Sequence, residues 1–411
     1  MTRFRIEIEA LQPIQLGDRL DESGAHTKSK NTIDGQTLRG SLAARFLETM
    51  AETDPWFRRA IVAGELACSP LYPVTGPVCE GDTWGPLPAT AMGCKQFAGF
   101  TSSDKSNRHG IFDSLLTQYP WPTENTGKPS SGGPVSLTRL HCLQKDKFGL
   151  CNAPMNRQKG FFHISELAGA SLVCPKQTLI TRSAVHPWID SVRDGMLFSL
   201  RPFREGSRFA GILDCPEDLN TKPLEAIDQL FFGKAITRGF GMAKVNITRQ
   251  TEPLFGGLAD RVSAMRQHRN RFAEPEAKDE TRISLDLWSP VILRDPWMRD
   301  RLEITGEDLH VFDSSLQWQV QPVVLDATWI GGWYGLMGLP KCHRQAIAAG
   351  SVLAVSIRGD RGQALAALDK LERFGLGEQI ADGFGRVVVC HPFHCNYSQE
   401  EVFHGKQRQP A

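Results

Sequence analysis

A glycine-rich segment occurs twice in the sequence, as GKAITRGFG at residues 233–241 and as GEQIADGFG at residues 377–385. This repeat is the main evidence for the predicted fold. An apolar run follows each copy and ends at Val245 or Val389. Self-similar segments placed alike relative to their neighbours indicate an internal repeat. The sequence therefore predicts two copies of one structural unit.

The segments before the two loops also match. RIEIEALQPIQL at 5–16 aligns with RISLDLWSPVIL at 282–293, and both alternate polar and apolar residues as half-buried strands do. Before each loop, apolar residues recur at helical spacing: Leu224, Ile227, Leu230 and Phe231 in one copy, Leu365, Leu368, Leu371 and Phe374 in the other. A unit that begins with a strand and ends helix, loop, strand fits a βαββαβ ferredoxin-like domain, the fold of RNA-recognition modules. The predicted fold class is α+β, with two such domains in tandem.

The two predicted copies differ in length. Residues 282–395 have the size of one ferredoxin-like domain, whereas residues 1–250 are roughly twice as long. We therefore expect an insertion in the first domain at about 66–175, where the periodic patterns give way to Pro, Gly, Ser and Cys. A linker is expected at 251–281 and a tail at 396–411.

Composition narrows the class of protein. The chain has 411 residues, of which 41% are hydrophobic and 23% charged, as in ordinary globular proteins. The formal net charge of +1 lacks the excess of a generically basic nucleic-acid binder. The start, MTRFRIEIEA, is unlike a secretory signal, and no apolar run is long enough to span a membrane. We expect a cytoplasmic protein whose ten scattered cysteines are thiols or metal ligands rather than disulfides.

Cysteines and histidines near the expected insertion predict a structural zinc site. Cys94, His109, Cys142 and Cys151 supply four nitrogen or sulfur ligands, which suits a tetrahedral ion that holds a segment with little core of its own. His141 is an alternative to Cys142, and buried free thiols are the alternative to a metal. The tail at 390–395 has ligand chemistry too, but residues at the end of a strand alternate faces.

The segment IDGQTLRGSLAARF at 33–46 predicts a turn at Gly35 followed by a helix. Arg39 and Arg45 are expected to point outward from this helix, whose start offers free backbone N–H groups. Together these features suit a phosphate group. The alternative is the solvated face of an ordinary helix.

The repeated loops are also candidates for RNA contact, because glycines expose backbone N–H groups and the loops add cations and aromatic rings. The alternative is a tight connection between helix and strand. The candidate contacts are Lys234, Arg238, Gly239, Phe240 and Gly241 in the first loop, and Gly383, Phe384, Gly385 and Arg386 at the second.

No familiar catalytic motif is present in the sequence. Candidates for RNA cleavage are His26 with Lys28 as an acid and base, or the carboxylates of Asp18, Asp21 and Glu22. A solvated polar loop explains the same residues. We expect no catalysis, because the segment contains Gly17 and Gly24 and offers little rigidity for aligned proton transfer.

Several motifs of the sequence resemble those of the RAMP superfamily of CRISPR-associated proteins. They are the strand at 4–11, the motif IDGQTLRG at 33–40 and the paired glycine loops, although Asp34 stands where the family has proline. LPAT at 87–90, Cys94 with Lys95, HGIFD at 109–113 and the run 151–162 are similar to the type III-D effector subunit called Csx-ten. The resemblance covers nearly the whole chain, but the family has a closer cysteine pair than Cys142 and Cys151.

This resemblance implies a non-catalytic, RNA-binding subunit of a type III effector complex. It would cap the 5′ repeat-derived handle of the guide RNA and contact the large polymerase-like subunit. The implied partners are guide RNA, target RNA, other RAMP backbone subunits and the large subunit, with no membrane. Two alternatives stay open: a RAMP-type ribonuclease acting through the Asp18–Lys28 loop, and an RNA-binding module outside CRISPR systems.

Overall fold

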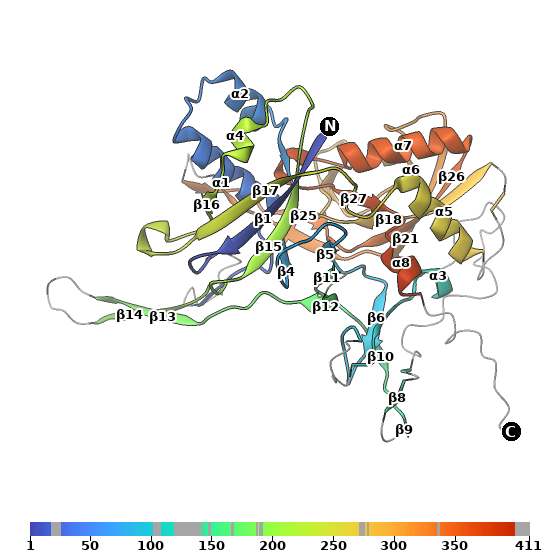
Figure 1. The fold of residues 1–411 in the computed structure, drawn as a ribbon, viewed down its shortest axis with the longest axis horizontal. Helices are drawn as coiled ribbons and strands as arrows, with labels where there is room; N and C mark the ends of the chain where they lie inside the picture. Colours follow the sequence, from blue (N-terminus) through green and yellow to red (C-terminus); the bar gives the residue numbers. More distant parts are fainter. Residues whose placement is uncertain are drawn as a thin grey trace. The chain divides into compact units, whose positions relative to one another are not determined.

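A computed structural model describes residues 1–17, 26–101, 108–118, 141–142, 144–146, 149–165, 168–185, 188, 192–270, 276–277, 279–334 and 338–398. The fold is mixed α/β, with several sheets and few helices (Figure 1). Two compact units are present. Unit 1 comprises Met1–Gly85, Val173–Thr251 and Ala381–Gly383, and unit 2 comprises Pro86–Leu172, Glu252–Ile380 and Phe384–Ala411. Pro86–Leu172 thus interrupts unit 1 in the sequence but belongs to unit 2.

Unit 1 is built on an antiparallel sheet with β1 (Thr2–Ala10) at its centre. β17 (Met242–Gln250) and β15 (Arg208–Cys215) flank β1. Its buried residues, Phe4, Ile6, Ile8 and Ala10, alternate with partly exposed ones, as expected for a half-buried strand. The outer strands are β16 (Gln229–Phe231) beside β17, and β3 (Ala67–Cys68) and β4 (Tyr72–Val74) beside β15.

Few helices accompany this sheet. The predicted helix is present as α1 (Gly35–Leu47), which begins at Gly35, where a turn was expected, and buries Leu38, Leu42 and Phe46 in the unit 1 core. The other elements are α2 (Pro55–Phe57), a π-helical turn η1 (Arg58–Val62), α4 (Lys222–Glu225), and a small sheet of β13 (Ile180–Val185), β14 (Val192–Arg201) and β2 (His26–Lys28).

Unit 2 contains a four-stranded antiparallel sheet. β18 (Glu280–Leu287) lies between β26 (Val352–Arg358) and β27 (Val387–Val389), and β21 (Gln317–Val324) lies outside β26. α7 (Arg361–Phe374) packs its apolar stripe into the core of this unit, so the helix predicted before the second loop is confirmed (Figure 1). The other helices are α3 (Leu115–Gln118), α5 (Leu258–Arg269), α6 (Gly306–Leu309) and α8 (Phe393–Asn396).

The main strands of the two sheets follow the same order. In sequence they are β1, β3, β15 and β17 in unit 1, and β18, β21, β26 and β27 in unit 2. In both sheets the first strand lies between the third and the fourth, and the second lies outside the third. Every neighbouring pair among them is antiparallel.

The prediction of a helix before the first loop is largely wrong. The segment containing Leu224, Ile227, Leu230 and Phe231 forms the short helix α4 and then the strand β16. Leu230 is buried between exposed neighbours, which is the two-residue period of a strand. The spacing of three residues predicts a helix, but pairing with β17 places Leu230 in a strand.

The remaining strands form smaller ribbons and sheets. They are β5 (Thr83–Pro86), β6 (Ala91–Cys94), β7 (Ile111–Asp113), β8 (Lys145–Asp146), β9 (Gly149–Leu150), β10 (Met155–Arg157), β11 (Phe161–Ser165), β12 (Gly169–Val173), β19 (Leu293–Arg294), β20 (Asp300–Arg301), β22 (Ala327–Ile330), β23 (Trp333–Tyr334), β24 (Leu339–Pro340) and β25 (Arg344–Ile347). Among the described residues, no helix is long and apolar enough to cross a membrane.

Candidate functional site

Four predicted metal ligands come together in unit 2. Cys94 ends β6, and His109 lies just before β7, which pairs antiparallel with β6. Cys142 and Cys151 lie before and after the β8–β9 ribbon. One ligand atom from each residue lies within 4.8 Å of the other three.

The spacing of these atoms suits a tetrahedral metal ion. The Sγ atoms of Cys94 and Cys151 are 3.7 Å apart, and His109 Nδ1 is 3.2 Å from Cys142 Sγ. Zinc–sulfur bonds of about 2.3 Å at tetrahedral angles separate two sulfur ligands by about 3.8 Å. Three sulfurs with one imidazole are a common structural zinc donor set. The residues present therefore fit this ion.

Burial sets the electrostatics of the four ligands. Cys94, His109 and Cys142 are buried, and Cys151 is partly exposed. Burial raises the pKa of Cys142 to about 12. Burial also opposes ionisation of Cys94, but backbone N–H groups of Phe97 and Gln96 donate to its sulfur and hold its pKa below the usual value. A bound dication would stabilise thiolates that burial disfavours.

The alternative ligands do not join this cluster. His141 is exposed, and its Nδ1 lies 3.0 Å from the carbonyl oxygen of Asn152, so the geometry favours Cys142. Within the described part of the chain, the cysteines and histidines at 390–395 form no group with metal-ligand spacing.

The two glycine loops share one backbone geometry. Each contains a short 3₁₀ helix, η3 (Ile236–Arg238) or η4 (Ile380–Asp382). The amide of Lys234 donates to Gln15, and that of Glu378 donates to Ile292, both at 3.0 Å and at aligned positions of the repeat. Four equivalent pairs of residues have φ between +57° and +92°: 233 and 377, 235 and 379, 239 and 383, 241 and 385.

The turn itself explains the last glycine of each loop. The amides of Gly241 and Gly385 donate to the carbonyl oxygens of Pro13 and Pro290 at 2.9 and 2.8 Å. A Cβ at Gly241 or Gly385 would collide with the carbonyl oxygen of Phe232 or Leu376. These glycines are therefore needed for the connection, whatever the loops bind.

The loops differ in charge. Lys234 and Arg238 in the first loop stand where the second has Glu378 and Asp382. Lys234, Arg238 and Gly239 are exposed, and the space beside Gly239 is open. The first loop thus presents two exposed cations beside open space, which suits an anionic ligand.

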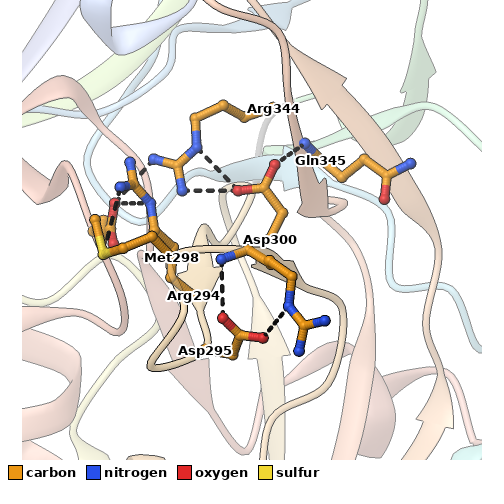
Figure 2. A network of polar contacts seen from close by, with 8 residues as sticks. Arg294, Asp295, Met298, Asp300, Arg344 and Gln345 are labelled. Carbon is orange, nitrogen blue, oxygen red and sulfur yellow. Dashed lines mark hydrogen bonds and ion pairs between the residues drawn. The ribbon is translucent and has the colours of Figure 1, made fainter.

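Salt bridges neutralise the second loop. Glu378 lies 3.2 Å from Arg294 and 2.9 Å from Arg344. Figure 2 shows that Arg344 also contacts Asp300, at 2.9 Å. Asp382, which groups with unit 1, pairs with Arg39 at 2.5 Å. The acidic side chains of this loop are therefore held by arginines.

The other residues predicted to contact RNA are less accessible. Phe240 and Phe384 are buried, so neither ring offers a free face to a base in this conformation. Gly35, Gly241, Gly383, Gly385 and Arg386 are buried as well. Arg39 also donates to the carbonyl oxygen of Ile61, and Arg45 pairs with Glu48. Their contacts with RNA stay predictions, and the geometry favours Lys234, Arg238 and Gly239.

The candidate residues for RNA cleavage cannot be placed as a site. Asp18, Asp21 and Glu22 lie outside the described residues. His26 and Lys28 belong to β2, which pairs in parallel with β14, but their side chains are also outside the described part.

A buried charged cluster in unit 2 has no counterpart in the sequence analysis. His394 in α8 is fully buried; its Nε2 lies 2.7 Å from Asp286 and its Nδ1 lies 3.0 Å from Asp113. Burial lowers the pKa of His394, but the two carboxylates raise it more, to about 10. The cluster links β7, β18 and α8, which are too distant in sequence for a local pattern to reveal.

Comparisons with known proteins find no matching family model and no matching curated protein. Solved structures do match. A chain of a type III-B Cmr-beta complex bound to cognate target RNA and AMPPnP has 12% identity and a TM-score of 0.42, covering 85% of this chain and 86% of that one. A CRISPR-associated protein Cas6 has 8% identity and a TM-score of 0.33, covering 94% and 98%. Oligomeric Cmr4 from Pyrococcus furiosus has 12% identity and a TM-score of 0.25, covering 61% and 99%. Because these scores are low, the proposals below rest on this chain's own residues.

Proposed function

We propose that this chain is an RNA-binding RAMP subunit of a type III CRISPR effector complex, built from two ferredoxin-like domains. It caps the 5′ repeat-derived handle of the guide RNA and contacts the large subunit. The sequence resemblance to Csx-ten supports this assignment. The shared strand order of the two sheets supports the tandem ferredoxin-like architecture.

The observation that carries RNA binding is the charge contrast between two loops of the same backbone geometry. Lys234 and Arg238 are exposed in the first loop, whereas salt bridges hold their acidic counterparts in the second. Basic side chains contact phosphates in protein–nucleic acid complexes. The first loop is therefore the proposed phosphate contact.

We also propose that the four-ligand centre holds zinc in a structural role. Cys94, His109, Cys142 and Cys151 would fill all four positions of a tetrahedral ion. A closed coordination sphere leaves no position for water or substrate, so this ion would stabilise the fold and take no part in catalysis.

Giving the first loop the charges of the second is expected to weaken guide RNA binding. The variant Lys234→Glu/Arg238→Asp leaves the backbone contacts in place but removes up to two phosphate contacts. Each lost contact is expected to reduce the slope of log affinity against log salt by about one. Filter binding of a guide RNA at several salt concentrations measures both the affinity and the slope.

Arg249→Glu is the matched control. Arg249 is an exposed basic residue on β17. It lies seven residues, or roughly 23 Å, along the strand from Met242, which is next to the loop. Its variant should keep most of the affinity. Equal guide RNA binding by the parent and the loop variant at every salt concentration would contradict the phosphate contact.

The purified protein is expected not to cut RNA. Metal-free cleavage needs an aligned acid and base, and metal-dependent cleavage needs clustered carboxylates. Within the described residues, the single group with metal-ligand spacing is the Cys94 cluster, which lacks carboxylates. Incubation with repeat-containing RNA and with guide-complementary RNA, with and without magnesium, tests this. Specific cleavage that His26→Ala or Asp21→Ala abolishes would favour the ribonuclease alternative instead.

A further inference from the structure

Unit 2 exposes large aromatic side chains on two neighbouring elements. Trp297, in the turn between β19 and β20, is 75% exposed. Trp333 and Tyr334, in the ribbon of β22 to β25, are 59% and 51% exposed. Trp329 and Leu339 of the same ribbon are also exposed. Exposed large apolar side chains that gather on one surface indicate an interaction site, whereas single exposed ones are common.

Cations accompany these rings. The guanidinium of Arg299 lies 5.3 Å from the ring centre of Trp297, and the ammonium of Lys341 lies 5.3 Å from that of Tyr334. The segment 327–347 contains Lys341, His343 and Arg344 but no Asp or Glu. The two acids in the segment 293–301, Asp295 and Asp300, are both paired with arginines. These pairs involve Arg299 and Arg344 themselves, but the two segments still contain more basic than acidic residues, so the surface is aromatic with a modest excess of cations.

The carboxylates of Asp295 and Asp300 hold the Trp297 turn in place. Asp295 accepts hydrogen bonds from the amides of Trp297 and Arg299, each at 2.9 Å. Asp300, at the start of β20, accepts from the amide of Gln345 at 2.8 Å and pairs with Arg344, which ties the turn to β25 (Figure 2). The turn is thus ordered before any ligand binds, which reduces the entropy lost on binding.

We propose that Trp297, Trp333 and Tyr334, with Arg299 and Lys341, bind unpaired bases of single-stranded RNA by stacking. Every base has a π-face, so aromatic rings bind single strands with little sequence preference, while neighbouring cations attract the phosphates. The absence of acids from the segment 327–347 favours RNA over an average protein partner. This inference rests on the proposed RNA-binding function and adds a second contact, separate in sequence from the Lys234–Gly241 loop.

Binding of a fluorescein-labelled oligouridine to the full-length protein tests the surface. Trp297→Ala/Trp333→Ala is expected to bind the probe about tenfold more weakly or worse, because each stacked base contributes substantially. The salt slope should stay unchanged, since tryptophan releases no counterions. Trp297→Tyr/Trp333→Tyr should retain most of the affinity, and an RNA duplex of the same length should bind all of these variants alike.

Two comparisons separate the outcomes. Val311→Ala is the control, because Val311 is an 80% exposed apolar residue of unit 2 outside this surface. If the alanine variant keeps parental affinity for oligouridine while Lys234→Glu/Arg238→Asp loses affinity for guide RNA, this inference fails and the proposed function stands. If the alanine variant keeps its RNA affinity but loses a copurifying protein, the surface is a protein interface and the inference is overturned. If the alanine variant binds oligouridine more weakly but Lys234→Glu/Arg238→Asp binds guide RNA like the parent, the loop proposal fails and the aromatic contact stands.

Discussion

Protein purified without chelators is expected to contain one zinc ion per chain, and its removal is expected to unfold the segment formed by β6, β7 and β10. The apolar cluster beside the ligands is small, with Met92, Ala153 and Met155 as its main non-ligand members. Structural zinc contributes about 10–16 kcal/mol in small zinc-binding peptides at neutral pH. The apolar contacts of this small cluster are too few to replace that free energy when the ion is removed. Elemental analysis measures the metal content, and limited proteolysis before and after chelation measures the order of the segment.

Substitution of a ligand should reproduce the effect of the chelator. Cys94→Ser is expected to lower the zinc content and to expose the segment to protease. Cys342→Ser is the matched control, because Cys342 is an exposed cysteine of unit 2 outside the cluster. Well under half an equivalent of zinc in freshly purified parent protein would show that the four residues are free thiols and imidazole.

The repeated loop and the ligand cluster could be predicted from the sequence because both depend on residue types with narrow roles. The equivalent glycines of the two loops occupy left-handed backbone conformations, which few other residues adopt readily. Cysteine and histidine are the usual zinc ligands, so a few of them near an expected insertion already formed a testable set. The structure brings Cys94, His109, Cys142 and Cys151 together as that set requires.

Features that depend on pairing between residues distant in the sequence could not be predicted from the sequence. The spacing of Leu224, Ile227 and Leu230 fits a helix, but pairing with β17 places Leu230 in a strand. Arg39 was expected to face solvent, yet Asp382, 343 residues further along the chain, binds its guanidinium. No local pattern in one sequence specifies such partners, because they depend on which elements the fold brings together.

The buried cluster around His394 is the clearest example of a feature that no local sequence pattern specifies. Loss of its histidine should strongly destabilise the protein. His394→Gln is expected to remove about 3–5 kcal/mol of stability, since it leaves Asp113 and Asp286 buried without a cation. Urea denaturation followed by circular dichroism measures the change in the unfolding midpoint of unit 2. His310→Gln, at an exposed histidine of the same unit, should change stability by less than about 0.5 kcal/mol.

The same cluster predicts how stability depends on pH. His394 has a pKa of about 10 in the folded protein and 6.5 as its ordinary value, so the folded state binds the proton more tightly. Its contribution is therefore complete below about pH 6.5 and is lost as the pH rises towards 10. Burial lowers the pKa of the neighbouring His391 to about 3, so protonation of that residue opposes folding in acid. The difference between parent and His394→Gln should thus shrink between about pH 7 and 9.

A variant without charges distinguishes electrostatics from packing. Combining His394→Gln with Asp113→Asn and Asp286→Asn removes the uncompensated carboxylates, and much of the lost stability should return because no buried charge is left unpaired. The pH dependence between about 7 and 9 should also flatten, although burial raises the pKa of Cys395 to about 11 and ionisation of that thiol on unfolding adds a slope at higher pH. If the triple variant is no more stable than His394→Gln, the imidazole acts through its shape and contacts, and the buried charges are not what holds β7 and α8 to β18.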